Sequence, residues 1–185
     1  MSRLLLLVVL CGLSTSALAR LAPADLRSLF RDSELIVVVA PAHLKRDTPG
    51  TRQMRAGSAV LHVVEVVRGT YAEPTLELRW SNEVHDQPIS DLLSRYLLFL
   101  KRSKDGKWAP TRYGRSYYQM QHMRGLDTQW GFGVPVAASG MDPAEAKKLK
   151  LVRKAWLYDP FSRKDRKVDV IFASDVKRVS GALAK

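Results

Sequence analysis

The side chains that we consider first as metal ligands are the four histidines and the residues of one acidic loop. His43, His62, His85 and His122 are scattered along the chain, and residues 82–86, NEVHD, place carboxylates beside one of them. Zinc sites in proteins combine three or four such ligands. A single acidic loop with one histidine is far more often hydrated, and His62 falls on an expected strand, where a hydrogen-bonded surface histidine is the commoner arrangement. We therefore assign no metal ligand.

Hydrolytic chemistry would need a nucleophile, a base and an orienting group that converge in space. The sequence contains no G-x-S-x-G, H-E-x-x-H, P-loop or glycine-rich dinucleotide motif. We assign no catalytic residue and no cofactor. A hydrolase whose site only the fold assembles remains one alternative.

Positive charge is the stronger chemical signal. The formal net charge is +12, which favours association with anionic partners without identifying them. One group of cations, which we call the hairpin tip, is Lys101, Arg102, Lys104 and Lys107 around Asp105-Gly106, a dipeptide typical of a type I′ hairpin turn. Solvation and protection of an edge strand explain these charges without a ligand.

A second group of cations lies in the C-terminal third. Asp142 as N-cap, Pro143 at the first helical position and Glu145 in a capping-box position predict a helix that continues to Asp159-Pro160. Leu149, Val152 and Trp156 would form its apolar stripe. Because a helix holds charges rigidly, we expect any polyanion affinity to follow this segment and its basic loop rather than the hairpin tip. The candidate binding residues here are Lys147, Lys148, Lys150, Arg153, Lys154, Arg163 and Lys164.

Aromatic residues alternate with arginines in YGRSYYQMQHM, residues 113–123. Such a pattern is typical of stacking platforms for single-stranded nucleic acid, but tyrosines at alternate strand positions also simply cover a barrel. We favour the covering role. Arg112, Tyr113, Arg115 and the separate Trp130 in QWGFG are kept as further candidate binding residues.

The N-terminal residues 1–19 have the layout of a cleaved secretory signal, with Arg3, an apolar run from 4 to 10, and small residues at Ala17 and Ala19. The apolar run is shorter than the roughly 20 residues that span a bilayer. Lipidation of Cys11 is the alternative, although Leu10 does not suit it. We expect a soluble periplasmic or secreted protein that begins at Arg20, has no cysteine and no transmembrane segment, and forms one domain over 20–185.

The rest of the chain is predicted to be mainly β, with helices at its ends. Residues 34–40 form a Val-rich run that suits a strand buried on both faces, and residues 60–67 and 96–100 are expected to be central strands, with Val64 in the core. Residues 75–80, TLELRW, alternate between apolar and polar side chains, which indicates a strand with one buried face. A further strand, VDVIFA, and a closing helix, SDVKRVSGALAK, end the extension 141–185.

This succession of SELIVVVA, a long strand ending in VVRG, an alternating strand and RYLLFL with its DG hairpin resembles the netrin-module and tissue-inhibitor-of-metalloproteinases superfamily, in particular bacterial exported relatives. The resemblance covers residues 33–120 and rests on pattern. It implies an OB-like, five-stranded Greek-key barrel with a binding role. Tissue inhibitors bind the protease zinc through a disulfide-bonded N-terminal cysteine. The expected mature chain lacks one, so no functional residue is transferred.

Three functions follow as hypotheses. The first is a non-enzymatic module that binds another exported protein as an inhibitor or accessory subunit. The second is a binder of an extracytoplasmic polyanion, such as a glycan, a lipid headgroup or, less favoured, nucleic acid. The third is the hydrolase named above. An exposed apolar patch ringed by charge would favour the first, and a continuous basic face the second.

Overall fold

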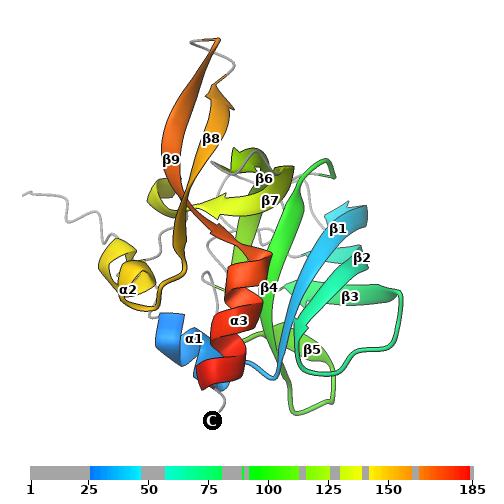
Figure 1. Cartoon of the computed structure of the whole chain (residues 1–185). Coiled ribbons are helices and arrows are strands. Elements are labelled where there is room, and N and C mark those ends of the chain that lie inside the picture. Colours follow the sequence, from blue (N-terminus) through cyan, green and yellow to red (C-terminus); the bar gives the residue numbers. More distant parts are fainter. Residues whose placement is uncertain are drawn as a thin grey trace, which may run out of the picture.

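The computed structural model describes residues 26–46, 57–80, 89, 92–112, 116–125, 130–138, 142–159 and 163–183. The expected signal segment, 1–19, and the expected acidic loop, 82–86, lie outside these residues. The fold is mainly β, with antiparallel strands and a few helices (Figure 1). The elements are α1 (Leu26–Asp32), β1 (Leu35–Arg46), β2 (Gly57–Arg68), β3 (Thr75–Trp80), β4 (Arg95–Arg102), β5 (Trp108–Pro110), β6 (Tyr117–Gly125), β7 (Trp130–Pro135), the 3-10 turn η1 (Val136–Ala138), α2 (Pro143–Lys148), β8 (Val152–Asp159), β9 (Lys164–Phe172) and α3 (Ala173–Leu183).

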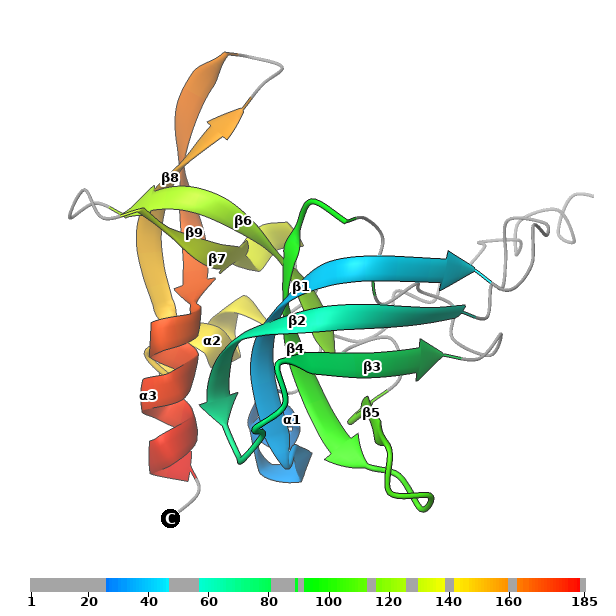
Figure 2. The same ribbon diagram turned by 90° about the vertical axis from the view of Figure 1, so that its right-hand side faces the viewer.

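Strand β1 is central to the first half of the molecule because it pairs with both β2 and β4. Three register shifts along its pairing with β2 accompany the bend of the strand (Figure 2). Its residues from Leu35 to Val39 are all buried, and they alternate between two apolar cores. The prediction of a strand buried on both faces is confirmed.

The two cores lie on opposite sides of β1 and β4. One core is enclosed by the strands themselves and contains side chains such as Leu61, Leu78 and Leu98. The other lies between these strands and the helices, and there Phe99 and Leu97 meet Leu26 of α1. Helices α1 and α3 pack on this second core, and α3 also contacts β2.

Strands β2 and β3 confirm one prediction and correct another. Leu76, Leu78 and Trp80 are buried while the residues between them are exposed, as the alternation predicts. Val64, however, is 44% exposed, so its placement in the core was wrong. The register shifts between β1 and β2 change which β2 side chains face inward. A run of valines carries no signal for that change.

Strands β6, β7, β9 and β8 close a ring of pairings in the second half of the molecule. β6 pairs with β7, β7 with β9, β9 with β8, and β8 again with β6. Met123, Ala155, Leu157 and Val170 are buried inside this ring. A Cβ at Gly133 would lie 2.4 Å from a methyl carbon of Val170, so glycine permits the close approach of β7 to β9.

The long helix expected after Asp142 is wrong. Helix α2 ends at Lys148, and Lys150 has a φ of 54°, a left-handed conformation that a helix cannot continue through. The chain then enters β8 and pairs with β9 along the whole of β8. Cross-strand packing of Ala155 and Leu157 inside the ring outweighs the helical spacing of the apolar residues.

Helices α1 and α3 lie where the sequence predicts helices. Leu26, Leu29 and Phe30 form the buried face of α1, and Val176 and Val179 are buried on α3. Both helices contribute to the same core.

Glu145 of α2 also fixes α1. Asp142 caps α2 as predicted, its side chain accepting a hydrogen bond from the Ala144 N–H at 2.8 Å. The Glu145 carboxylate accepts hydrogen bonds from the N–H groups of Leu26 (2.8 Å) and Arg27 (3.3 Å). It thereby satisfies two of the free donors at the start of α1.

We expect Glu145→Ala to lower the free energy of unfolding by about 1–2 kcal/mol, the usual cost of losing a helix cap. Lys147→Ala, an exposed change on the same helix, should cost less than about 0.5 kcal/mol. Urea denaturation of both variants measures the difference. Equal stabilities would show that the Glu145 contact contributes nothing.

Candidate binding surface on the β8–β9 ribbon

Strands β8 and β9 form a two-stranded ribbon that extends beyond the strands flanking it (Figure 1). β7 pairs with β9 only through residues 133–135, opposite 170–172. β6 pairs with β8 only at Ala155 and Trp156. Residues 157–159 of β8 and 164–169 of β9 pair with no other described strand than each other. We call this pair of strands the ribbon.

The two faces of the ribbon differ in chemistry. Residues opposite each other in an antiparallel pair share a face, and successive residues alternate. One face, with Ala155, Leu157 and Val170, fills the ring interior at its base. The other, which we call the outer face, carries Lys154, Trp156, Tyr158, Asp165, Lys167 and Asp169.

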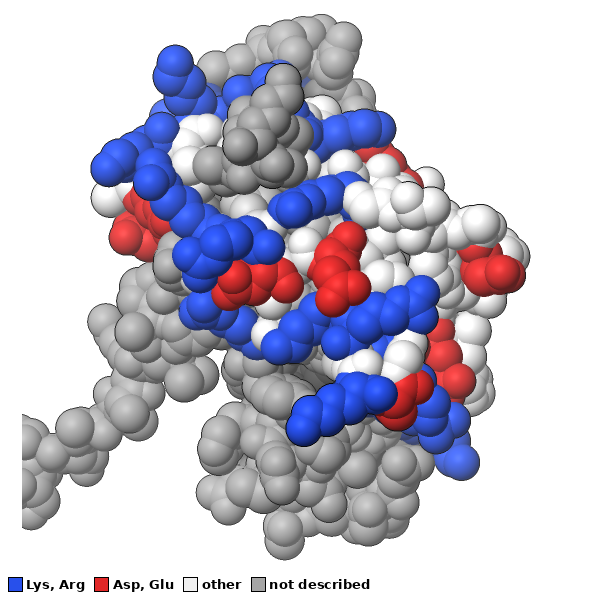
Figure 3. Space-filling model, turned by 90° about the horizontal axis from the view of Figure 1, so that it is seen from below, with Lys and Arg blue, Asp and Glu red and all other residues white. Residues whose placement is uncertain are grey.

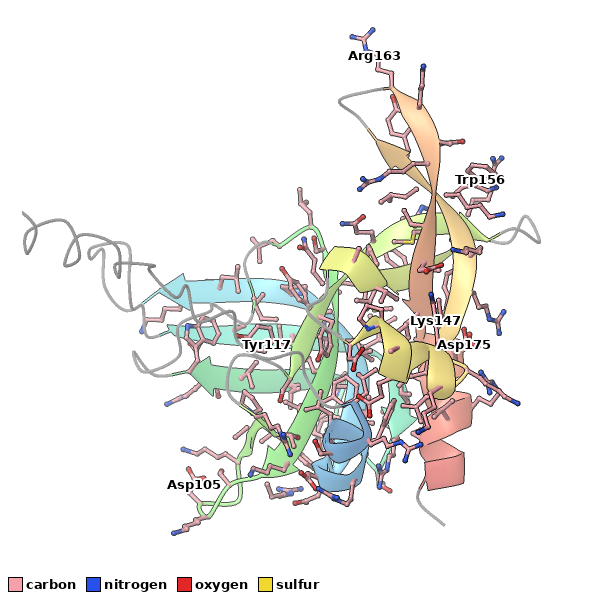
Figure 4. All side chains as sticks on the ribbon, turned by 90° about the vertical axis from the view of Figure 1, so that its left-hand side faces the viewer. Asp105, Tyr117, Lys147, Trp156, Arg163 and Asp175 are labelled. Carbon is pink, nitrogen blue, oxygen red and sulfur yellow. The ribbon has the colours of Figure 1, made fainter. Side chains whose placement is uncertain are left out.

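Aromatic side chains stand among charges on the outer face. Tyr158 is 58% exposed and Trp156 is half-buried to one side of the ribbon (Figure 4). Lys154 makes an ion pair with Asp169, and Arg124 of β6 lies 3.6 Å from the Asp165 carboxylate. The Arg124–Asp165 pair is exposed and contributes at most about 1 kcal/mol, so it can open toward a partner at small cost.

A cleft of about 360 Å³ runs beside the ribbon. One wall is largely apolar and comes from the end of β7, η1 and the start of α2. The other wall comes from the ribbon. The lining residues are Pro135, Val136, Ala137 and Pro143 on the first wall, and Lys154, Arg166, Lys167, Val168 and Asp169 on the second.

The residues predicted from the sequence divide between several surfaces. Lys154 and Lys164 belong to the ribbon, and Arg163 lies at its end with a φ of 53° (Figure 4). Lys147 and Lys148 are exposed on α2. Lys150 is exposed in the turn before β8, where its carbonyl accepts a hydrogen bond from Arg178 at 2.7 Å.

The Arg153 side chain is about half exposed, but it is engaged in an ion pair with a buried residue. Its guanidinium donates two hydrogen bonds, of 3.0 and 2.7 Å, to one carboxylate oxygen of Asp175. Asp175 is 1% exposed in the first turn of α3, so this pair joins the base of β8 to the closing helix. The Arg178 guanidinium lies 3.4 Å from the same oxygen, so two arginines hold this buried carboxylate. Arg153 therefore has a structural role.

The other candidates do not join the ribbon. Arg112 donates a hydrogen bond to Asp32 at 3.2 Å, and with Arg31 it lowers the pKa of that carboxyl, the Arg31 hydrogen bond being the larger cause. Tyr113 and Arg115 lie outside the described residues. Trp130 begins β7, and its side chain also lies outside the description. Tyr118 is buried in the core, so it offers no stacking surface.

Tyr158, Arg124 and Asp169 were missed as members of the site by sequence reasoning. Lys154, Trp156 and Tyr158 recur at every second position, which is the spacing of one strand face. That signal was present, but it was masked by the helical spacing of Leu149, Val152 and Trp156.

The hairpin tip lies at the opposite end of the molecule, as the positions of Asp105 and Arg163 show (Figure 4). Its turn is not type I′. The Gly106 N–H donates a hydrogen bond to the Ser103 carbonyl at 2.9 Å, and within this turn only Gly106 has a positive φ. These features define a type I turn followed by a glycine bulge. Arg102 therefore faces Trp108 across the hairpin.

Contacts within the tip occupy several of its polar groups. The Arg102 guanidinium lies 4.4 Å from the Trp108 ring centroid and donates to the Gly106 carbonyl at 2.7 Å. Trp108 meets Tyr71 edge to face, with centroids 6.3 Å apart. A hydrogen bond from the Ser103 hydroxyl lowers the pKa of Asp105. The interpretation of the tip as a solvated hairpin end explains these contacts without a ligand.

Cations elsewhere on the described surface are mixed with carboxylates. Seen from below, Lys and Arg side chains are interspersed with Asp and Glu (Figure 3). Asp32, for example, contacts both Arg31 and Arg112. This face is therefore not a continuous basic patch.

Within the residues that the structure describes, no group of three or more histidine, cysteine, aspartate or glutamate side chains is placed to hold a metal ion. No helix in this part of the chain is both long and apolar enough to span a membrane.

Comparison with known proteins finds no matching family model, no matching curated protein and no matching solved structure.

Proposed function

We propose that this chain is an exported, non-enzymatic binding module that engages another extracytoplasmic protein through the outer face of the ribbon. The observation that carries the proposal is that Tyr158 is exposed and Trp156 half-exposed on strands that extend beyond their neighbours. Around these two aromatic side chains lie the cations Lys154, Lys167 and Arg124. Protein interfaces are enriched in tyrosine, tryptophan and arginine, and such aromatic anchors dominate their energetics.

The charge of the ribbon supports an acidic surface on the partner. Residues 152–172 contain six lysines and arginines against three aspartates. Complementary charge of this kind raises association rates and fixes orientation more than it adds affinity. The role proposed is that of an inhibitor or accessory subunit.

The fold we propose for the first half is an OB-like barrel related to the netrin module. The pairing order β3-β2-β1-β4-β5, with a bent β1 shared between two neighbours, supports it. Tyr71 and Trp108 are in contact beside β3 and β5, which supports closure of the barrel on that side.

Export is proposed from residues 1–19, and a mature N-terminus at Arg20, measured by mass spectrometry, would support it.

A photo-crosslinking amino acid at position 158 tests the proposed function, with position 104 at the hairpin tip as the matched exposed control. We expect the protein in its native extracytoplasmic fraction to form an adduct with one acidic protein from position 158 and none from position 104. Trp156→Ala should weaken binding of that protein about tenfold or more, as for an interface anchor. No adduct, or equal adducts from both positions, would contradict the proposal.

Binding of a polyanion is the second candidate, favoured by the same excess of cations on the ribbon. Neutralising Lys164, Arg166 and Lys167 to glutamine should then lower the salt at which the protein elutes from heparin more than neutralising Lys101, Lys104 and Lys107. Counterion release makes elution salt report the number of anionic contacts. A larger loss from the tip variant would exclude the ribbon as the polyanion site.

A further inference from the structure

One edge of β9 is without a described strand partner along most of its length. β8 follows β9 from Lys164 to Ile171, whereas β7 accompanies it only at residues 170–172. After Pro135 the chain leaves the sheet and forms η1. In an antiparallel strand, backbone N–H and C=O groups alternate between the two sides. About half of the backbone N–H and C=O groups of residues 164–169 therefore point away from β8, to the side on which β7 no longer pairs with β9.

The cleft described above lies along this edge. Residues 166–169 of β9 form one wall of it, and Pro135, Val136 and Pro143 contribute to the other. The two prolines have no N–H group, so they do not compete for backbone hydrogen bonds. A peptide strand entering the cleft would meet backbone hydrogen-bonding groups on β9 and apolar side chains opposite.

The positive charge of the cleft favours an acidic peptide strand as its occupant. Lys154, Arg166 and Lys167 line it together with a single carboxylate, Asp169, which is already paired with Lys154. Among the described residues no carboxylate lies within ion-pairing distance of Arg166 or Lys167. Acidic side chains on an incoming strand would be complementary to these two cations.

We propose that an extended, acidic segment of the protein partner adds to β9 as a further strand, antiparallel to it and in line with β7. Side chains on one face of that segment meet Lys154 and Lys167, and those on the other meet Arg166 and Val168. Main-chain hydrogen bonds supply the affinity and the alternating side chains the specificity, as in other cases of strand addition. This inference rests on the proposed function, because it names how the partner binds at the ribbon.

The same charges disfavour a second copy of this chain as the occupant. Lysines and arginines on an edge strand discourage pairing with another edge of the same kind. A β9 edge brought against its own copy would set Arg166 and Lys167 against the same cations, in a chain of net charge +12. An acidic strand of another protein meets no such repulsion.

The test uses fluorescence anisotropy at low salt and a fluorescein-labelled, terminally capped peptide of eight residues. Pairs of glutamates alternate with pairs of valines in this peptide, so that carboxylates lie on both faces of the strand. We expect saturable binding to the full mature chain. Arg166→Glu with Lys167→Glu should weaken it by about tenfold or more, while Lys104→Glu with Lys107→Glu, the same change of charge at the hairpin tip, should weaken it by less than about threefold. Matching thermal melts establish that both variants fold.

Backbone methylation separates strand addition from charge attraction. Two further peptides carry N-methyl groups on one or the other set of alternate backbone nitrogens, with unchanged side chains. Strand addition predicts that at least one set weakens binding about tenfold or more, because methylation removes hydrogen bonds to the β9 edge. Equal binding of all three peptides would overturn strand addition and leave the proposed function standing.

The remaining outcomes also decide the question. If the parent peptide does not bind while crosslinking at position 158 captures an acidic protein, strand addition is wrong and the proposed function holds. Equal weakening by the ribbon and tip variants would overturn both. Dimerisation of the wild type that Arg166→Glu with Lys167→Glu changes, measured by sedimentation, would identify a second copy as the occupant and overturn the acidic strand.

Discussion

Phe99→Ala is expected to lower the free energy of unfolding by about 3–5 kcal/mol, the range found when a buried phenylalanine is cut back to a methyl group. Phe99 is fully buried between the rings of Phe30 and Tyr118, which it meets edge to face at centroid distances of 5.6 and 5.8 Å. The cavity would open between α1, β4 and β6 at once. Urea denaturation followed by circular dichroism measures the loss.

Phe99→Leu is the matched variant for this position. It keeps most of the apolar volume and removes the two aromatic contacts, so a loss of about 1–2 kcal/mol is expected. The main chain of Phe99 also forms hydrogen bonds with Thr111, just after β5, and with Ser116, just before β6. Both variants leave these main-chain hydrogen bonds in place. If the two variants were equally stable, the packing around Phe99 would be looser than its burial indicates.

Gly69→Ala is expected to cost about 3 kcal/mol or more. Gly69 follows β2 with a φ of +87°, where an L side chain is strained by about 1–2 kcal/mol. A Cβ there would also lie 2.3 Å from the Glu34 carbonyl oxygen, a backbone atom just before β1. That contact can be relieved only by shifting the start of β1, and overpacking of this kind adds about 1–3 kcal/mol.

Gly106→Ala separates the two causes. Gly106 has a similar φ of +79°, but nothing lies within 4 Å of a Cβ built on it. Its substitution should therefore cost only the backbone strain, about 1–2 kcal/mol. Thermal unfolding of the two variants gives the comparison, and equal losses would show that the contact with Glu34 is relieved without cost.

Sequence reasoning succeeded where one period dominates a segment. TLELRW alternates without exception, and β3 has the burial that this alternation requires. It failed in KLKLVRKAWLYD, where Leu149, Val152 and Trp156 suit a helix while Lys154, Trp156 and Tyr158 suit a strand face. The pairing of β8 with β9 decides between them, and the periodicity within one segment does not report a contact with another segment.

The candidate site was predictable only as a set of residues. Lys154, Arg163 and Lys164 were chosen for their charge; Lys154 and Lys164 do lie on the ribbon, and Arg163 lies at its end. The sequence could not show that Arg153, one residue earlier, turns to the buried Asp175. It also held no sign that β7 would stop at Pro135 and leave an edge of β9 beside a cleft.

The contact between Glu145 and the start of α1 also sets the order in which the molecule can be completed during synthesis. The hydrogen bond to Leu26 joins residues 119 positions apart, and α1 has only seven residues. A helix that short is marginal in water by itself. Leu26 and Phe30 are also buried in the same core as Val176 and Val179 of α3. Helix α1 is the first described segment to leave the ribosome, and its apolar face is fully covered only once α3 has been made. Until then, Phe99 and its neighbours in the core cover part of that face.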